Sequence, residues 1–416
     1  MPIHRQLFPV LATILASLLL ASPIALAAGK GSAAETSRRP AAAHVGLGAA
    51  RDLGRANRCA NRISAARASR VGRSERRRVT RRLRRNCRRP ATESAAPGAP
   101  IYWGATIGDQ LTGEQAPWDM GAVSKFEETA GKKVSLVNFF SPFANCESSC
   151  SFYKFPTKPM ENIRQHGAIP VFSWSSQSIP SSLNEPNFQL ADVINGSYDS
   201  YIREFAEDAR DWGHPFFLRF DWEMNGNWFP WSEGVNGNQS GEFVTAWRHV
   251  HDIFTSVGAT NVSWDWCPNV DPTDKLQTSV AADYPGDEYV DWTGLDGYNW
   301  GPAKGGWTSF NHLYSATYHA ITEAVAPSKP MMIGEIGSTE NGGSKSSWIS
   351  EALAAIPTEY PKIRGMLWFD SFDDGMDWPI ESSSGASSAF ASGIQNTAYR
   401  TNTYASLAAG PIQPPS

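Results

Sequence analysis

Cysteine is scarce in this chain of 416 residues, and its five cysteines are not arranged as a metal site. Cys146 and Cys150 form a close pair, but no second cysteine pair or histidine cluster follows at the spacing of zinc ligands. We therefore expect no metal and no cofactor. The close pair predicts a disulfide that closes a tight loop, Cys59 and Cys87 could form a second one, and Cys267 is then a free buried thiol.

Sequence motifs of three other chemistries are absent as well. No G-x-S-x-G pattern is present, which disfavours an esterase. The glycine-rich stretch 337–345 lacks the G-x-x-x-x-G-K-[ST] pattern of a phosphate-binding loop. No G-x-G-x-x-G follows the first predicted strand, which disfavours a doubly wound dinucleotide-binding sheet.

Acidic residues are few in the first 99 positions, which hold 4 Asp+Glu against 20 Lys+Arg. The net charge of the whole chain is −4, so the first part carries about +16 and the rest about −20. The chain therefore combines two parts of opposite charge.

A long apolar run occurs near the N-terminus, from Leu7 to Ala28, and no other stretch is apolar enough to span a bilayer. The run leads into Ala25-Leu26-Ala27, which is typical of a cleavage site. It predicts a signal peptide over residues 1–28 and a secreted protein, with a retained anchor helix as the alternative. Residues 29–50 are rich in Ala, Gly and Ser and predict a flexible tether, and residues 91–100 predict a linker.

Residues 51–90 contain 16 arginines and two acidic residues. Their apolar positions are too sparse for a full core, and we expect two short helices joined near Gly72. Such a charge run could bind nucleic acid, but it has no aromatic side chains for stacking on bases. We expect no nucleic acid partner. An anionic cell-wall or surface polymer is the partner that the arginines favour, with no specific partner as the alternative.

Residues 101–410 differ from the first part in their sequence pattern, which predicts a catalytic domain. Short apolar runs alternate there with helical stretches such as Ser200–Trp212 and Phe243–Val257, a pattern typical of parallel strands buried on both faces. Eight strands separated by helices predict an α/β fold, a (β/α)8 barrel. The predicted strands are Ile101–Ile107, Val134–Phe140, Ile169–Trp174, Phe216–Asp221, Val262–Cys267, Thr293–Tyr298, Met331–Ile336 and Ile363–Phe369.

Two carboxylates, Glu223 and Glu335, stand at the ends of predicted buried strands. Desolvation of a carboxylate at such a position is costly unless it has a partner or a chemical role. Two carboxylates that face each other across a barrel mouth can cleave an acetal, one by protonating the leaving oxygen and one by attacking the anomeric carbon. The alternative is that each glutamate pairs with a nearby cation such as Arg219.

The residues around Glu223 resemble glycoside hydrolase family 26. Glu-Met-Asn-Gly at 223–226 is followed by Asn-Trp-Phe-Pro-Trp, and the likeness continues through Gly294–Tyr298 and Gly334–Gly337 over most of residues 101–400. The resemblance implies a retaining endo-β-glycosidase of the β-mannanase kind that acts on plant-type polysaccharide.

The resemblance also implies roles for single residues. Glu223 matches the acid/base and Glu335 the nucleophile, while Arg219 matches an arginine that orients the active-site carboxylates and Tyr298 a tyrosine that hydrogen-bonds the nucleophile. The other residues expected to bind substrate are Trp222, Asn225, Trp228, Trp231, Trp300 and Trp368.

One departure from the family pattern concerns the substrate. Mannan-cleaving members usually carry histidine directly before the acid/base, where this chain has Trp222. If Trp222 turns aside and Asp221 or Asn299 contacts the sugar 2-OH, β-1,4-mannan is favoured, and that is the substrate we expect. The alternatives are mixed-linkage β-glucan, β-1,3-xylan, and a catalytically dead barrel that only binds polysaccharide.

Overall fold

The structure, a computed structural model, describes residues 98–270 and 278–416. The predicted signal peptide, tether, arginine-rich segment and Cys59–Cys87 pair lie outside the described residues. Within the described part the strands are β1 (Tyr102–Ile107), β2 (Leu136–Asn145), β3 (Ser151–Phe152), β4 (Ile169–Ile179), β5 (Phe216–Phe220), β6 (Val262–Trp266), β7 (Trp292–Asn299), β8 (Met331–Ser338) and β9 (Ile363–Asp370).

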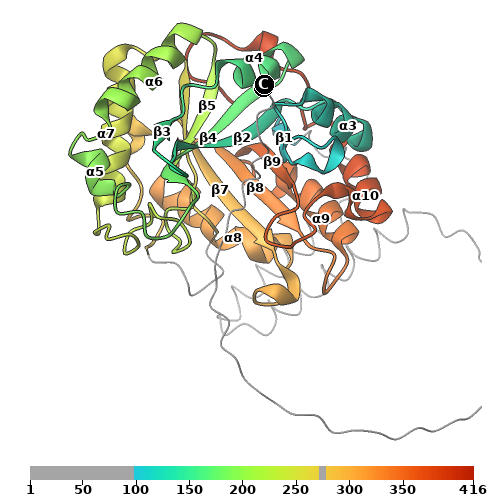
Figure 1. Ribbon diagram of the computed structural model, residues 1–416. Coiled ribbons are helices and arrows are strands. Elements are labelled where there is room, and N and C mark those ends of the chain that lie inside the picture. Colours follow the sequence, from blue (N-terminus) through green and yellow to red (C-terminus); the bar gives the residue numbers. More distant parts are fainter. Residues whose placement is uncertain (1–97, 271–277) are drawn as a thin grey trace, which may run out of the picture. The chain divides into compact units, whose positions relative to one another are not determined.

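The strands form a closed barrel with the helices on its outside (Figure 1). Neighbours follow the order β1-β9-β8-β7-β6-β5-β4-β2, and β1 also pairs with β2, all in parallel. The helices are α3 (Met120–Ala130), α4 (Thr157–His166), α5 (Leu190–Ile194), α6 (Asp199–Trp212), α7 (Glu242–Val257), α8 (Phe310–Ala320), α9 (Lys345–Glu359) and α10 (Ser384–Ile394). The predicted (β/α)8 barrel is confirmed, and each of its eight predicted strands overlaps an observed one.

Alternation along the strands gives the barrel an inner and an outer layer of side chains. On β1, for example, Trp103 points outward and packs against Phe126 of α3 and Phe390 of α10. Inward-facing residues fill the end of the barrel at which the strands begin, a cluster of Tyr102, Leu136, Ile169, Val171, Phe217, Trp292, Met332 and Leu367. This end is filled mainly by apolar side chains, and the polar side chains described below lie toward the other end.

The C-terminal segment closes the apolar end of the barrel. Ile412 belongs to the same buried cluster and is 3% exposed. Its backbone N–H donates to Ser263 Oγ at 2.7 Å, and its carbonyl accepts from Trp292 Nε1 at 2.8 Å. The folded unit therefore extends past residue 410, where the sequence predicts its end.

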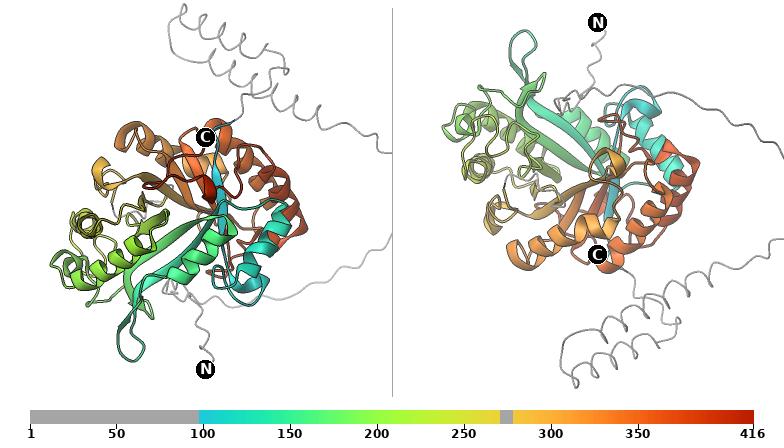
Figure 2. Two further views of the ribbon diagram at one scale, coloured as in Figure 1. Left: turned by 90° about the horizontal axis from the view of Figure 1, so that it is seen from above. Right: turned by 90° about the horizontal axis from the view of Figure 1, so that it is seen from below.

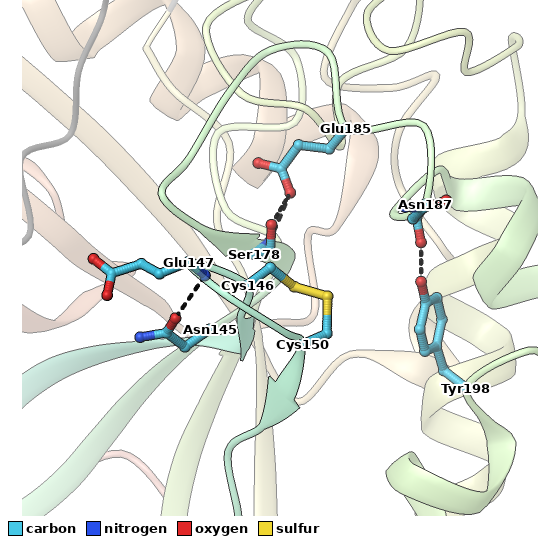
Figure 3. Close-up of a disulfide and its surroundings, with 8 residues drawn as sticks. All are labelled: Asn145, Cys146, Glu147, Cys150, Ser178, Glu185, Asn187 and Tyr198. Carbon is cyan, nitrogen blue, oxygen red and sulfur yellow. Dashed lines mark hydrogen bonds between the residues drawn. A yellow bond between two sulfur atoms is a disulfide. The ribbon is translucent and has the colours of Figure 1, made fainter.

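A hairpin extends β2 into the short antiparallel β3, which the sequence does not predict. The predicted Cys146–Cys150 disulfide closes the loop between these two strands (Figure 3). The hairpin projects from the body of the barrel in both views of Figure 2. Cys267 is a buried free cysteine, also as predicted. Among the described helices, none has both the length and the apolar character needed to cross a membrane.

Candidate active site

A hydrogen-bonded network of polar side chains crosses the barrel interior above the apolar cluster. Asn138 donates to Thr106 at 2.8 Å and accepts from Ser173 Oγ at 2.8 Å, and Arg219 Nη1 donates to Ser173 Oγ at 3.0 Å. These residues come from β1, β2, β4 and β5. All are 9% exposed or less, and Arg219 is fully buried. Through Ser173, this network holds the Arg219 guanidinium in place from the side of the apolar cluster.

Glu335, on β8, is held at both carboxylate oxygens. Arg219 Nη2 donates to Oε1 at 2.7 Å, and the Tyr298 hydroxyl, from the end of β7, donates to Oε2. Arg219 also forms a buried ion pair with Asp296 of β7. The Tyr314 hydroxyl of α8 donates to the backbone carbonyl of Glu335 at 3.1 Å. One carboxylate is thus fixed in orientation with a cation beside it.

Glu223 follows β5 and is held by two neutral donors. Trp228 Nε1 donates to Oε2 at 2.6 Å, and Asn269 Nδ2 donates to Oε1 at 2.5 Å. Burial, and next the charge of Glu335, raise the pKa of Glu223 to about 7, although both hydrogen bonds act in the opposite direction. At neutral pH, Glu223 is therefore able to give or take a proton.

The backbone around Glu223 adopts an uncommon conformation. Asp221 and Glu223 both have positive φ, 43° and 53°, which is sparsely populated for residues other than glycine. The turn is secured because Asp221 accepts from Ser176 N at 2.7 Å and from its hydroxyl at 2.6 Å. The N–H of Glu223 donates to the carbonyl of Cys267 at 2.7 Å. Tertiary contacts therefore impose the turn that aims Glu223.

Glu223 and Glu335 face each other at short range. One carboxylate oxygen each of Glu223, Asp296 and Glu335 lies within 4.8 Å of the others. Such a trio has the ligand types of a cation site, but the Arg219 guanidinium already pairs with Asp296 and Glu335. The arrangement is therefore a pair of carboxylates with the guanidinium of Arg219 beside one of them.

Aromatic side chains line the mouth around the pair. Tyr298 packs against Phe369, Trp300 and Trp378 with ring centroids 5.7, 5.9 and 4.8 Å apart. Trp228 lies beside Glu223. A Cβ on Gly226 would come within 2.5 Å of the Trp228 ring, so a glycine is needed there for the indole to reach Glu223. Trp228, Tyr298 and Trp300 keep part of their surface exposed.

Two tryptophans that the sequence predicts to bind substrate, Trp368 and Trp231, do not reach the site. Trp368 is fully buried and points outward from β9, where its ring packs against Phe390 of α10. The expectation for Trp368 is wrong because its neighbour Phe369 occupies the inward phase of the strand. Trp231 is also fully buried, and its Nε1 donates to the carbonyl of Trp222 at 2.7 Å. It supports the turn and offers no free face to a sugar.

Asn225 is likewise buried, and its side chain is bonded to the backbone of Asn269. Its Nδ2 donates to the Asn269 carbonyl at 3.0 Å, and its Oδ1 accepts from the Asn269 N–H at 2.9 Å. Asn225 is 0% exposed, so the prediction that it binds substrate is wrong. It positions Asn269, which in turn holds Glu223.

Trp222 is 5% exposed, and its ring packs against Phe140, Phe229 and Trp231. The Arg219 guanidinium carbon lies 5.1 Å from the ring centroid. Trp222 therefore forms an apolar wall beside the carboxylates.

Asn269, Asp296 and Cys267 are not among the residues that the sequence assigns to the site, although each lies within three residues of the end of a barrel strand. That position was the available signal, because strand ends converge at one mouth. Trp378, which packs on Tyr298, lies in the loop after β9 and carries no such signal.

Comparison with known proteins matches this architecture to one family. The family model described as glycosyl hydrolase family 26 matches residues 151–394. Endoglucanase H of Acetivibrio thermocellus is 35% identical over 281 residues, which are 66% of this chain and 29% of that protein. Mannan endo-1,4-beta-mannosidase A and B of Caldalkalibacillus mannanilyticus is 30% identical over 156 residues, or 36% of this chain and 27% of that protein.

The chain thus spans less than a third of the length of these two relatives. Among solved structures, the catalytic domain of the Bacillus sp. JAMB-750 family 26 endo-β-1,4-mannanase superposes with a TM-score of 0.57 at 18% identity, covering 74% of this chain and 88% of that one. This likeness concerns the fold. The family model covers more than half of the chain, and its match includes both facing glutamates. The chain belongs to glycosyl hydrolase family 26.

Proposed function

We propose that this glycoside hydrolase is a retaining endo-β-glycosidase in which Glu335 is the nucleophile and Glu223 the acid/base. The observation that carries the proposal is the facing pair of carboxylates, with one oxygen of Glu223 no more than 4.8 Å from one oxygen of Glu335. Retaining enzymes place the two carboxyl groups about 5–5.5 Å apart, whereas inverting enzymes need about 6.5–9.5 Å to admit a water molecule. The short separation supports double displacement.

The different surroundings of the two glutamates support the two roles. Arg219 and Tyr298 hold Glu335 in one orientation with a cation beside it, which suits attack on the anomeric carbon. Glu223 has a pKa of about 7 and two neutral donors, so it can protonate the leaving oxygen and later deprotonate a water molecule. Each residue thereby returns to its starting state at the end of the cycle.

Variants of the two glutamates test the mechanism. Glu335→Ala removes the nucleophile and should abolish turnover of polymer and aryl glycoside alike. Glu223→Ala should cleave polymer at least 100-fold more slowly but spare substrates with good leaving groups, which need little protonation. Azide should accelerate Glu223→Ala and yield a β-glycosyl azide. Wild-type rates for both variants on both substrates would refute the assignment.

For the substrate, we propose mixed-linkage β-glucan ahead of β-1,4-mannan. Mannan was expected on condition that Asp221 or Asn299 contacts the sugar 2-OH, but both are 0% exposed. The Asp221 carboxylate is bonded to Ser176, and the Asn299 amide donates to Ser338 Oγ at 3.0 Å. Trp222 is packed in place, and an indole can donate but not accept a hydrogen bond. The site therefore lacks the imidazole that family mannanases use.

The comparison with Endoglucanase H supports the same order of substrates, since that relative's name refers to glucan and its match covers more of this chain than the mannanase match. The second candidate remains β-1,4-mannan, which the name of the other relative favours. β-1,3-Xylan is a third possibility within the family.

Initial rates on barley mixed-linkage glucan, galactomannan, glucomannan and β-1,3-xylan at equal mass concentration decide the substrate. We expect the highest rate on the mixed-linkage glucan, with a rapid fall in viscosity that marks endo action. Trp222→His should raise the galactomannan-to-glucan rate ratio, whereas Trp300→His, whose indole packs on Tyr298 and Trp378, should not. A wild-type preference for galactomannan would overturn the glucan proposal without affecting the catalytic assignment.

We further propose that the protein is secreted through a signal peptide over residues 1–28, with residues 29–50 as a tether, 51–90 as an arginine-rich attachment segment and 91–100 as a linker. Support comes from the sequence, because the apolar run and the small-x-small pattern precede the basic segment. N-terminal sequencing of the exported protein tests the cleavage site near Ala27.

A further inference from the structure

We propose that Cys267 is a positioning residue that links the two catalytic glutamates through its backbone carbonyl and its thiol. The proposal rests on the roles of Glu223 and Glu335 given above. Cys267 directly follows β6, between the strands that carry the two glutamates. It is fully buried, so it acts through other residues and does not touch substrate.

The two polar groups of Cys267 point to different halves of the site. Its carbonyl accepts from the N–H of Glu223 at 2.7 Å. Its thiol donates to Asp296 Oδ1 at 3.0 Å. Asp296 forms an ion pair with Arg219, whose Nη2 also donates to Glu335 at 2.7 Å. A continuous path of direct contacts therefore joins the acid/base to the nucleophile through Cys267, Asp296 and Arg219.

The space for the thiol is created by glycines on the two next strands. A Cβ on Gly294 of β7 would come within 2.4 Å of the Cys267 sulfur. A Cβ on Gly334 of β8 would lie 2.8 Å from the same sulfur and 2.7 Å from Asp296 Oδ1. Neither glycine has positive φ, so the backbone conformation does not require glycine at either position. What requires it is the close approach of the thiol and the carboxylate.

The thiol matters because Asp296 is fully buried. Burial raises the pKa of the Asp296 carboxyl well above its ordinary value, and the Arg219 charge opposes this shift. Burial also raises the pKa of the Cys267 thiol, which keeps its proton and remains a donor. Without the thiol, Asp296 Oδ1 loses a hydrogen bond that favours the ionised form. A protonated Asp296 no longer anchors Arg219, and the orientation of Glu335 is then less well fixed.

Three variants separate this role from simple packing. Cys267→Ala removes the thiol but keeps the carbonyl that holds Glu223, and Cys267→Ser keeps a donor. Val123→Ala is the matched control, because Val123 is fully buried on α3 and its truncation opens a cavity of similar size away from the site. Each variant is assayed in the full chain for kcat, KM and melting temperature on the polymer that the wild type cleaves best.

We expect Cys267→Ala to lower kcat about tenfold with KM changed less than twofold, since the defect lies in the orientation of the nucleophile. Cys267→Ser should restore kcat to within about threefold of the wild type. Val123→Ala should lower the melting temperature and leave kcat unchanged.

A kcat for Cys267→Ala within twofold of the wild type would overturn the proposal. If Cys267→Ala does not fold, Cys267→Ser decides alone, and a tenfold loss of kcat at an unchanged melting temperature refutes the donor role. Glu335→Ala distinguishes the two levels of inference. If Glu335→Ala keeps activity, the catalytic assignment fails; if only Cys267→Ala keeps it, the positioning role alone fails.

Discussion

At the residue scale, the proposed mechanism makes the protonation state of Glu223 govern the pH dependence of cleavage. Its pKa is raised to about 7, so the acid that protonates the leaving oxygen is present below this pH and is lost as the pH rises through it. The charged and hydrogen-bonding groups around Glu223 include Glu335, Asp296, Arg219, Trp228 and Asn269. We expect the basic limb of the kcat/KM profile on polymer to fall near pH 7.

Trp228→Phe should move that limb to higher pH. The variant keeps an aromatic ring but removes the N–H that favours the ionised form of Glu223, so the acid retains its proton longer. Trp300→Phe is the control, because Trp300 packs on Tyr298 without a bond to Glu223. The measurement is kcat/KM between pH 4 and 9. A limb that stays in place in Trp228→Phe, or shifts equally in Trp300→Phe, would contradict the role of this hydrogen bond.

The residues of the site were predictable to the extent that they stand at strand ends. Glu223 and Glu335 stand at or near the ends of apolar runs, and the structure brings the two carboxylates together. Whether a strand side chain points into the barrel or outward depends on the pleat and on the helix that covers it. For this reason, the sequence places Trp368 on the wrong face of its strand. Asn225 was misassigned because its partner, Asn269, lies 44 positions away.

At the element scale, the barrel strands were predictable because parallel strands buried on both faces read as short apolar runs. The conformation of the loop after β9 was not predictable, since it depends on contacts with residues distant in the sequence, including those of one buried lysine. Lys345, at the start of α9, is 0% exposed and donates to the carbonyls of Trp378 and Pro379 at 3.1 and 2.8 Å and to Ser382 Oγ at 2.9 Å. This lysine holds Trp378 against Tyr298.

Lys345→Met should therefore destabilise the protein and impair catalysis. Burial lowers the pKa of Lys345 to about 8, so at pH 7 the ammonium is still mainly charged, and its loss leaves several buried acceptors without a donor. We expect a loss of about 3 kcal/mol in the free energy of unfolding, measured by urea denaturation, together with a lower kcat. Lys125→Met removes an exposed lysine bonded to a single carbonyl and should change stability by less than about 0.5 kcal/mol. Equal effects of the two variants would argue against the loop anchor.

At the scale of the whole molecule, the opposite charges of the two parts suggest separate roles: the barrel hydrolyses substrate, and the arginine-rich segment attaches to an anionic surface. The barrel is closed by its own C-terminal segment, with Ile412 in the apolar end, so its fold is built from residues after the linker. The barrel part carries about −20 and the first 99 residues about +16. Like charges repel, so an anionic wall or surface polymer should repel the barrel and attract the arginines of residues 51–90.

A chain that begins at Ala99 should hydrolyse soluble polymer like the full chain but lose retention on anionic polymer. Retention of the full chain should collapse as salt rises, because exposed charges are screened beyond about 8–10 Å near physiological ionic strength. The measurement is the fraction of protein that cosediments with an insoluble anionic cell-wall polymer between 10 mM and 500 mM NaCl, with activity on soluble glucan as the internal standard. Replacing the 16 arginines of residues 51–90 by glutamine is the matched control, since it keeps chain length and removes charge. Equal retention of the full and shortened chains at low salt would remove any anchoring role for the arginines, and retention that persists at 500 mM NaCl would show that contacts other than charge carry it.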